Sequence, residues 1–419
     1  MAMIADMAGW EILDSRGRPT VAARCILDSG AAGSASVPSG ASTGGAEALE
    51  LRDGDSQRYR GFGCRKAANH VSGEIREAIL HCTFNSQSTF DHALIALDGT
   101  PSKSRLGANA LLAASIAFAR AVASQRRVPL YQHFAEMLGR SSCSLPRLTI
   151  NLFSGGKHAG GQVPIQDVLI VPVAAATIDE ALATAFEVYQ SAAELTGRKY
   201  GTRMLTADEG GLAPPFPNVE TMLSDAVESI HAAGLTPGRE VSLAVDVAAS
   251  HFLIDGRYQM GDKWLSSLQM IDLLDDWLNR FPIISVEDGL AENDWEFWPQ
   301  LCERVSDRAI VLGDDLLCTN PARITRAIEA QATNALLLKV NQIGTLTEAA
   351  EALRLARSAG WKVTISARSG ETEDNWLADL AVGWNAHYIK VGSITQSERL
   401  SKYNRLLAIE RDLRLPVAT

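Results

Sequence analysis

The sequence predicts an α/β protein made of a (β/α)8 barrel and, before it, a smaller α+β capping domain. The 419 residues exceed what one ordinary domain needs. After Pro146, short apolar runs alternate with helical stretches, which is the pattern of a barrel. Before Pro146, strand and helix signals are mixed without this repeat. We therefore expect residues 1–138 to form the capping domain and residues 139–419 to form the catalytic barrel.

The first part of the chain contains a strand, a loop and a helix that can be predicted from composition. Thr20–Leu27 is rich in β-branched and apolar residues and is predicted to be a strand. Gly40–Gly44 is a Gly/Ser/Thr-rich loop. Leu106–Ser124 is rich in Ala and Leu and is predicted to be a helix that ends before Pro129. Gly139–Pro146 is the best candidate for the linker between the two domains.

The second part contains eight apolar runs of strand length. They are Leu148–Phe153, Val168–Val171, Ser242–Val245, Ile283–Val286, Ile310–Leu312, Ala335–Leu338, Val363–Ser366 and Tyr388–Ile389. Helical stretches such as Pro321–Ala332 and Thr345–Ser358 separate most of them. This alternation indicates parallel strands joined by crossovers. A doubly wound sheet is the second choice, but no Gly-x-Gly-x-x-Gly string follows an early strand.

Composition excludes several classes of protein. A hydrophobic content of 46% with 21% charged residues is typical of a globular protein and argues against disorder. The formal net charge of −10 argues against binding to a nucleic-acid backbone. No signal peptide is expected at residues 1–7, and no apolar run of about 18 residues predicts a membrane span. Six scattered cysteines without a Cys-x-x-Cys pair indicate reduced thiols in a cytoplasmic protein.

Charged residues follow most of the predicted strands. In chain order they are Asp246, Glu287 with Asp288, Asp314 with Asp315, Lys339, Arg368 with Ser369, and Lys390. In a (β/α)8 barrel the C-terminal ends of the strands meet on one face, and the active site lies there. The sequence therefore places three carboxylates and then three cations around one mouth.

This order of charges predicts a magnesium site beside a catalytic lysine. Asp246, Glu287 and Asp314 supply the carboxylate oxygens that Mg²⁺ prefers. A nearby divalent cation disfavours the ammonium form of Lys339, so that a neutral lysine could accept a proton next to a substrate carboxylate. Arg368 and Ser369 could hold a phosphate.

Each of these residues, taken alone, also has a purely structural explanation. A single Asp after a strand is usually a helix cap, and a single Lys there is usually a solvated charge. Asp288 and Asp315 are expected to be caps even if their neighbours bind metal. It is unexpected that chance alone would bring all six positions to one face, with three carboxylates followed by three cations. A shared functional role explains the arrangement better.

Several long strings identify the family that this chain resembles. They are ILDSRGRPT at 12–20, VPSGASTG at 37–44, LDGTPSKSRLGANA at 97–110, DEGGLAP at 208–214, LLLKVNQIGT at 336–345, RSGETED at 368–374 and KYNRLLAIE at 402–410. With these strings the sequence resembles enolase over nearly its whole length. The resemblance implies an enolase-type barrel, a homodimer or higher homo-oligomer, and two Mg²⁺ ions per active site.

The resemblance also implies a role for each matching residue. Asp246, Glu287 and Asp314 would hold the catalytic Mg²⁺, and Ser42 would help to bind a second Mg²⁺ and close over the site. Lys339 would remove the α-proton of 2-phosphoglycerate, and Glu209 would protonate the departing hydroxide. Asp167 would be the carboxylate near that hydroxide. The remaining substrate contacts would come from His158, Gln166, Arg368, Ser369 and Lys390.

The sequence departs from the family pattern close to these residues. Ala367 replaces a histidine beside the phosphate-binding arginine. Asp167 replaces a glutamate and is shorter by one methylene. Gly289, His251 and Gln396 replace the family's proline, glutamate and arginine in other motifs.

Two interpretations of these departures stay open. The chain is either an enolase that has drifted, or a relative that dehydrates a 2-phosphoglycerate analogue with an altered phosphoryl group. Carboxyphosphonoenolpyruvate synthase-like enzymes of phosphonate biosynthesis are of the second kind. A third hypothesis, a catalytically silent structural or binding relative, requires the loss of a metal ligand or of the base, and all of these residues are present.

Overall fold

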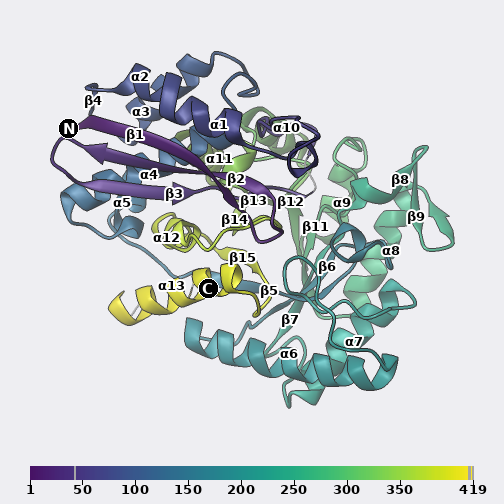
Figure 1. Cartoon of the computed structure of the whole chain (residues 1–419). Helices are drawn as coiled ribbons and strands as arrows, with labels where there is room; N and C mark the ends of the chain where they lie inside the picture. Colours follow the sequence, from purple (N-terminus) through teal and green to yellow (C-terminus); the bar gives the residue numbers. More distant parts are fainter. Residues whose placement is uncertain (42–43, 414–416, 418–419) are drawn as a thin grey trace.

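The computed structural model describes residues 1–41, 44–413 and 417. An antiparallel sheet with its helices forms one part, and a closed barrel surrounded by helices forms the other (Figure 1). The predicted fold class, a (β/α)8 barrel with an α+β capping domain, is confirmed.

The capping domain is built around a four-stranded sheet. Its strands are β1 (Ala2–Leu13), β2 (Pro19–Leu27), β3 (Ala32–Ser36) and β4 (Thr83–Phe84), in the order β3-β2-β1-β4. The helices are α1 (Arg65–His70), α2 (Arg76–Ile79), α3 (Gln87–Asp98), α4 (Ala108–Arg126) and α5 (Leu130–Met137), with short helical turns η1 (Tyr59–Gly61) and η2 (Val71–Ile75). Helix α4 packs across β2 and β3, where a Cβ at Gly33 would come within 2.4 Å of the Ala121 backbone nitrogen. Glycine at this position therefore allows the close approach.

The barrel contains all eight predicted strands. They are β5 (Arg147–Ser154), β6 (Asp167–Val171), β7 (Ser242–Asp246), β11 (Ile283–Glu287), β12 (Ile310–Gly313), β13 (Ala335–Leu338), β14 (Lys362–Ser366) and β15 (Tyr388–Gly392). Among the described residues they close in the order β11-β12-β13-β14-β15-β5-β6-β7. A small hairpin sheet, β8 (Leu253–Ile254), β9 (Arg257–Met260) and β10 (Lys263–Leu265), lies outside the barrel.

One part of the barrel prediction is wrong, because the strands are not all parallel. Strand β6 runs antiparallel to both β5 and β7. The segment between β5 and β6 contains only the short turn η3 (Gly156–Ala159) and no crossover helix, which a parallel connection usually requires. Because β6 is reversed, its first residue, Asp167, lies opposite Asp246, the last residue of β7.

Helices surround the barrel and pack against its strands. They are α6 (Ile178–Tyr200), α7 (Val219–Ala232), α8 (Ser267–Arg280), α9 (Trp298–Val305), α10 (Pro321–Ala330), α11 (Leu346–Ser358), α12 (Trp376–Gly383) and α13 (Ser397–Leu413), with turns η4 (Ala249–Phe252) and η5 (Val340–Gln342). Side-chain caps begin several of them, such as Thr345, whose hydroxyl accepts from the Glu348 backbone N–H. The two stretches expected to be helical, Pro321–Ala332 and Thr345–Ser358, correspond to α10 and α11.

The capping domain is docked on the barrel through buried polar contacts. The Asp91 carboxylate on α3 accepts from the backbone N–H and the hydroxyl of Thr347 on α11. Lys103 forms an ion pair with Glu348 at 2.7 Å. Helices α5 and α12 also pack against each other. These contacts hold the loops of the capping domain over the barrel mouth.

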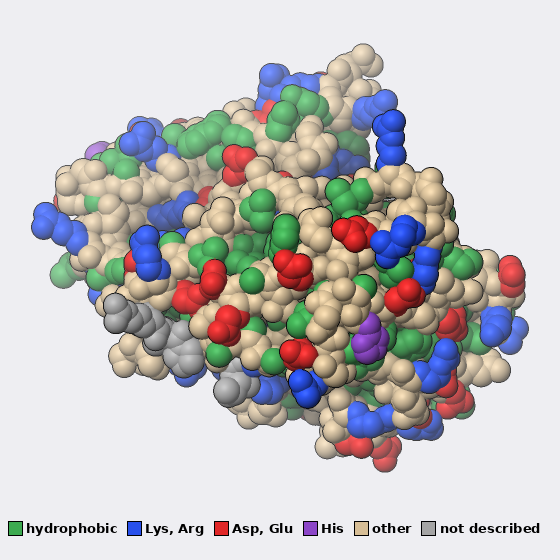
Figure 2. Space-filling view, turned by 90° about the horizontal axis from the view of Figure 1, so that it is seen from below, with side chains coloured by type: hydrophobic (Ala, Val, Ile, Leu, Met, Phe, Trp, Pro, Cys, Tyr) green, Lys and Arg blue, Asp and Glu red, His purple; other side chains and the backbone are tan. Residues whose placement is uncertain are grey.

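The surface and the thiols agree with the composition. On the face shown in Figure 2, acidic and basic side chains are interspersed. All six cysteines are free thiols. Within the described part of the chain, we find no helix with the length and apolar character needed to cross a bilayer.

Candidate active site

A small cavity at the mouth of the barrel contains most of the predicted site residues. Its lining residues are Ala41, His158, Gln166, Glu209, Asp246, Lys339, Ser366, Ala367, Arg368, Ser369 and Lys390. They come from both domains and from six strand ends or their following loops. Glu287, Asp314 and Asp167 lie directly behind this lining, in contact with it through Lys390, Lys339 and His158. Ser42 lies outside the described residues.

The three predicted metal ligands lie on neighbouring strands and contact two lysines. Asp246 and Glu287 end β7 and β11, which are adjacent, and Asp314 follows β12. Lys390 donates to Asp246 Oδ2 at 2.7 Å and to both oxygens of Glu287 at 2.8 and 2.7 Å. Lys339 is paired with Asp314. The cluster is thus a buried set of alternating charges.

The buried charges shift one another's pKa values. Burial raises the pKa of the Glu287 carboxyl well above its usual range, and the negative charge of Asp246 raises it further. Burial also raises the pKa of Asp246, but the positive charges of Lys390, Lys339 and His158 together outweigh burial and lower the pKa of that carboxyl. Burial opposes the charged form of Lys390, yet Asp246 and Glu287 together raise its pKa well above the usual value. Each lysine therefore stabilises carboxylates that would otherwise repel one another.

Lys339 is protonated in this arrangement. Burial lowers its pKa, but the negative charges of Asp314 and Glu287 together outweigh burial and the net pKa is raised. The neutral lysine expected from the sequence therefore requires that Asp314 be engaged by another cation. A divalent ion on Asp314 would remove the ion pair and add its own repulsion to the ammonium form.

The donor set fits Mg²⁺ by its chemistry. Asp246, Glu287 and Asp314 are 2%, 3% and 7% exposed, and all three offer hard carboxylate oxygens. Gln166 donates to Asp246 Oδ2 at 3.1 Å, while its own buried Oε1 has no partner among the described residues. Such an oxygen can accept from a metal-bound water.

The three predicted ligands are not, however, the tightest carboxylate group. In the described chain, the groups of three ligands whose atoms lie within 4.8 Å of one another are His158–Asp167–Glu209 and Asp288–Asp314–Asp315. Lys390 lies between Asp246 and Glu287 and keeps the predicted triad apart. Asp246, Glu287 and Asp314 remain the better candidates for metal ligands. The reason is that the Asp288 oxygens already accept from the backbone N–H groups of Asp314 and Asp315 at 2.9 and 2.7 Å. Asp288 is thus a backbone acceptor for the loop after β12, and not the helix cap that the sequence suggested, since α9 begins only at Trp298.

The predicted phosphate-binding residues are held by the capping domain. The Ser369 hydroxyl oxygen accepts from the Ala41 backbone N–H at 2.9 Å and from Arg16 Nη1 at 3.2 Å. A Cβ at Gly370 would come within 2.2 Å of Arg16, so only glycine leaves room for this arginine. Arg368 donates to both oxygens of Glu47 at 3.0 and 3.1 Å. A phosphate that binds Arg368 must share or displace this carboxylate.

A second charged cluster lies beside Asp246, because Asp167 pairs with Asp246 on the neighbouring strand. His158 Nδ1 is 3.1 Å from Asp167 Oδ2, and its Nε2 is 3.9 Å from Glu209 Oε1. Ser154 donates to Asp167 Oδ1 at 2.6 Å, and Asn151 donates to Glu209 Oε2 at 3.1 Å. Asp167 thus faces His158 and is fully buried behind it.

The pKa of His158 is raised to about 9, because Asp167 and Glu209 outweigh the effect of burial. Burial raises the pKa of Asp167, and the histidine opposes that rise. Burial also acts on Glu209, but the positive charges of His158 and Arg399 lower its pKa. The cluster therefore holds an imidazolium between two carboxylates at neutral pH.

Asp167→Asn is expected to lower the pKa of His158. The folded-state pKa of about 9 lies above the ordinary histidine value, so the pair stabilises the fold below about pH 6.5 and loses that contribution as the pH rises through 9. The asparagine removes the carboxylate that acts more strongly on the imidazolium, since Asp167 is 3.1 Å from the ring and Glu209 is 3.9 Å away. Proton NMR titration of the His158 ring measures the change. An unchanged titration in Asp167→Asn would contradict the assignment of the ion pair.

Sequence reasoning missed four residues that shape this site. Arg16 and Glu47 come from the capping domain and reach Ser369 and Arg368. Gln342 donates to Asp314 Oδ1 at 2.9 Å. Arg399, fully buried, donates to the backbone oxygens of residues 368 and 369 at 2.7 and 2.6 Å. Arg16 and Gln342 lie inside family strings, which was the available signal.

A (β/α)8 barrel with acids and lysines at its mouth, capped by an α+β domain, has the architecture of a barrel enzyme whose active site lies at the C-terminal ends of the strands. Family models resolve the class further. The model of the enolase N-terminal domain matches residues 4–134, and the model of the enolase C-terminal TIM barrel domain matches residues 142–417. The chain therefore belongs to the enolase family, and its domains are those of a lyase-type enzyme.

Proposed function

We propose that this protein is a Mg²⁺-dependent dehydratase that converts 2-phosphoglycerate to phosphoenolpyruvate and water. The observation that carries the proposal is the cluster of buried Asp246, Glu287 and Asp314 with Lys339 and Lys390, next to a cavity that Glu209 also lines. Bound Mg²⁺ would supply charge stabilisation for a substrate carboxylate that becomes an ene-diolate. The other tasks fall to side chains of this chain.

Lys339 is the base in this proposal. Its amine removes the proton from the carbon next to the substrate carboxylate, and the electron pair left behind expels the hydroxide from the neighbouring carbon. His158, through Glu209, gives the proton that turns the hydroxide into water, since Glu209 is itself ionised beside the imidazolium. His158 carries a proton at neutral pH and lies 3.9 Å from Glu209, so the two form one proton-donating unit. The pairing of His158 with Asp167 keeps that ring in place.

Arg368, Ser369 and Lys390 orient the substrate. The arginine fork and the Ser369 hydroxyl face the cavity beside Ala41 and would take the phosphoryl group. Lys390 would bind the carboxylate of the substrate. Its ammonium group is held in place by Asp246 and Glu287. Glu47 would leave Arg368 when the phosphate binds.

Ala367 supports a second candidate substrate. This methyl group lines the cavity next to Arg368, in the place where the family has a histidine. The small side chain leaves space and removes a donor at the phosphate position. The alternative substrate is therefore a 2-phosphoglycerate analogue with a larger or less charged phosphoryl group.

A steady-state assay separates the two candidates. The substrates are 2-phosphoglycerate and its methyl ester at the phosphoryl group, each with Mg²⁺, and the variant is Ala367→His. We expect the native protein to turn over 2-phosphoglycerate with a kcat in the ordinary range of about 1–10³ s⁻¹. We expect Ala367→His to lower turnover of the ester, because the ring fills the extra space. Turnover of the ester alone would favour the analogue, and turnover of neither despite Mg²⁺ binding would reject both.

A further inference from the structure

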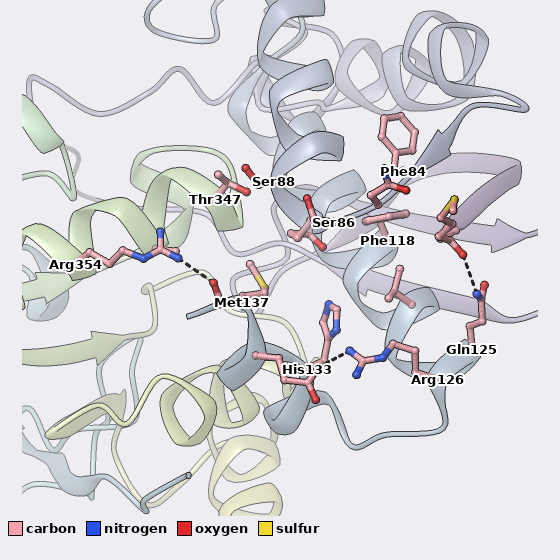
Figure 3. A pocket seen from close by; sticks show the side chains of 17 residues that line it. Phe84, Ser86, Ser88, Phe118, Gln125, Arg126, His133, Met137, Thr347 and Arg354 are labelled. Carbon is pink, nitrogen blue, oxygen red and sulfur yellow. Dashed lines mark hydrogen bonds and ion pairs between the residues drawn. The ribbon is translucent and has the colours of Figure 1, made fainter. Parts of the chain in front are cut away.

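A large cavity lies away from the barrel mouth, between the capping domain and the barrel. It measures about 500 Å³, within the range of small-molecule sites. Helices α3, α4 and α5 line it on one side and α11 on the other (Figure 3). It shares no lining residue with the candidate active site. The mechanism proposed above makes no use of it.

His133 on α5 is the most unusual residue of this cavity. Its side chain points into the space between Ser86 and Met137 (Figure 3). It is 6% exposed, and neither ring nitrogen has a hydrogen-bond partner among the described residues. Burial lowers its pKa to about 4, so the ring is neutral and offers one N–H donor and one acceptor. A buried polar group without partners costs about 1–3 kcal/mol, so a ligand that pairs with it gains affinity.

The polar wall of the cavity favours an anion. Helix α3 begins here at Gln87, after its cap Ser86, and has no acidic residue in its first turn. The backbone N–H groups of a helix N-terminus attract negative charge. Arg354 donates one hydrogen bond to the Met137 carbonyl at 2.8 Å and otherwise faces the cavity. Arg126 is paired with Glu136, so these three side chains carry one net positive charge.

Much of the remaining lining is apolar. Phe84 and Phe118 meet edge to face with ring centroids 6.0 Å apart. Val122 and Met137 add to the apolar surface on this side, and Ala350 adds to it from α11. Such a surface accepts an aromatic or branched aliphatic group.

We infer that this cavity is a binding site for a small carboxylate with an apolar body, such as an aromatic acid. The carboxylate would lie between the start of α3 and Arg354, and the apolar body would pack on Phe84 and Phe118. Both His133 ring nitrogens are buried beside the cavity, so a rotation of the ring would bring one of them to the ligand and fix its orientation. One net positive charge matches a monoanion better than a dianionic phosphate.

Binding at this position would also strengthen the contact between the two domains. Thr347 lines the cavity and donates twice to the buried Asp91 of α3. A ligand that touches α3, α5 and α11 together binds only when the domains are docked. It is therefore expected to raise the unfolding temperature through mass action.

Methyl NMR of the whole protein, labelled with ¹³C at the methionine methyl groups, tests the site. Of the eight methionines, Met1 and Met137 line the cavity, and Met137→Leu assigns the second signal. Benzoate is titrated to about 10 mM, ten times a weak Kd of about 1 mM, with benzyl alcohol as the neutral probe. We expect a saturable shift of the Met137 signal with benzoate and none of that size with benzyl alcohol.

Two variants examine the polar wall, with a third as control. Arg354→Met and His133→Phe are each expected to weaken benzoate binding about tenfold, which is 1.4 kcal/mol. Arg198→Met, which changes an exposed arginine on α6, is expected to bind as the native protein does. Arg354 is exposed, so its variant keeps the test valid if His133→Phe does not fold. The inference is overturned by an unsaturable Met137 shift, by equal binding of benzyl alcohol, or by undiminished binding in Arg354→Met.

Discussion

Lys339→Ala is expected to lower kcat for 2-phosphoglycerate by a factor of about 10²–10⁴, the usual contribution of a positioned general base. Lys339 lines the cavity and is paired with Asp314, so its amine lies at the edge of the metal cluster. Alanine removes the base and leaves Asp246 and Glu287 paired with Lys390. Binding of Mg²⁺ should therefore survive, and binding of substrate should change far less than turnover.

Lys362→Ala is the matched control for this prediction. Lys362 is an exposed lysine at the first residue of β14, at the other end of the strand from Ser366, and should keep native kinetics. The assay follows the absorbance of the enolpyruvate product at saturating Mg²⁺ for native protein and both variants. A Lys339→Ala protein with native kcat would assign the base to another residue, with Lys390 as the next candidate.

The fold could be predicted from the sequence because its elements depend on local patterns. Each barrel strand is a short apolar run between polar segments, and all eight predicted runs are strands of the barrel. The direction of β6 was missed because an apolar run reads the same whichever way the strand points. The lack of a helical pattern between Ser154 and Asp167 was the available clue. The helix predicted at Leu106 begins at Ala108, after Gly107, whose φ of 97° is not helical.

From strand patterns alone, the site could be predicted only where one strand end supplies one residue, and His158, Gln166 and Glu209 came from the family resemblance. Asp246, Glu287 and Lys390 each follow a run that the sequence shows directly. The contacts between domains could not be predicted in this way. Arg16 reaches Ser369 across 353 positions of sequence, and its role depends on how the domains dock. The charge state of Lys339 also depends on its contact with Asp314, and a sequence pattern does not predict that contact.

Glu287→Gln is expected to abolish Mg²⁺-dependent activity with little loss of stability in metal-free protein. The glutamine keeps the shape of the side chain and can still accept from Lys390, which retains its ion pair with Asp246. Replacement also relieves the repulsion by Asp246 that, after burial, raises the pKa of Glu287. A metal site that loses one of three carboxylates, however, loses much of its attraction for a hard cation.

Thermal unfolding with and without Mg²⁺ measures this difference. Native protein at a Mg²⁺ concentration about 100 times Kd should gain about 2.7 kcal/mol of stability, and Glu287→Gln should gain almost none. Glu303→Gln, an exposed carboxylate on α9, should respond as the native protein does and so excludes a general effect of net charge. If Glu287→Gln kept the full Mg²⁺ response, the ion would have to bind elsewhere. The cluster of Asp288, Asp314 and Asp315 would then be the next site to change, because its oxygens already lie within 4.8 Å of one another.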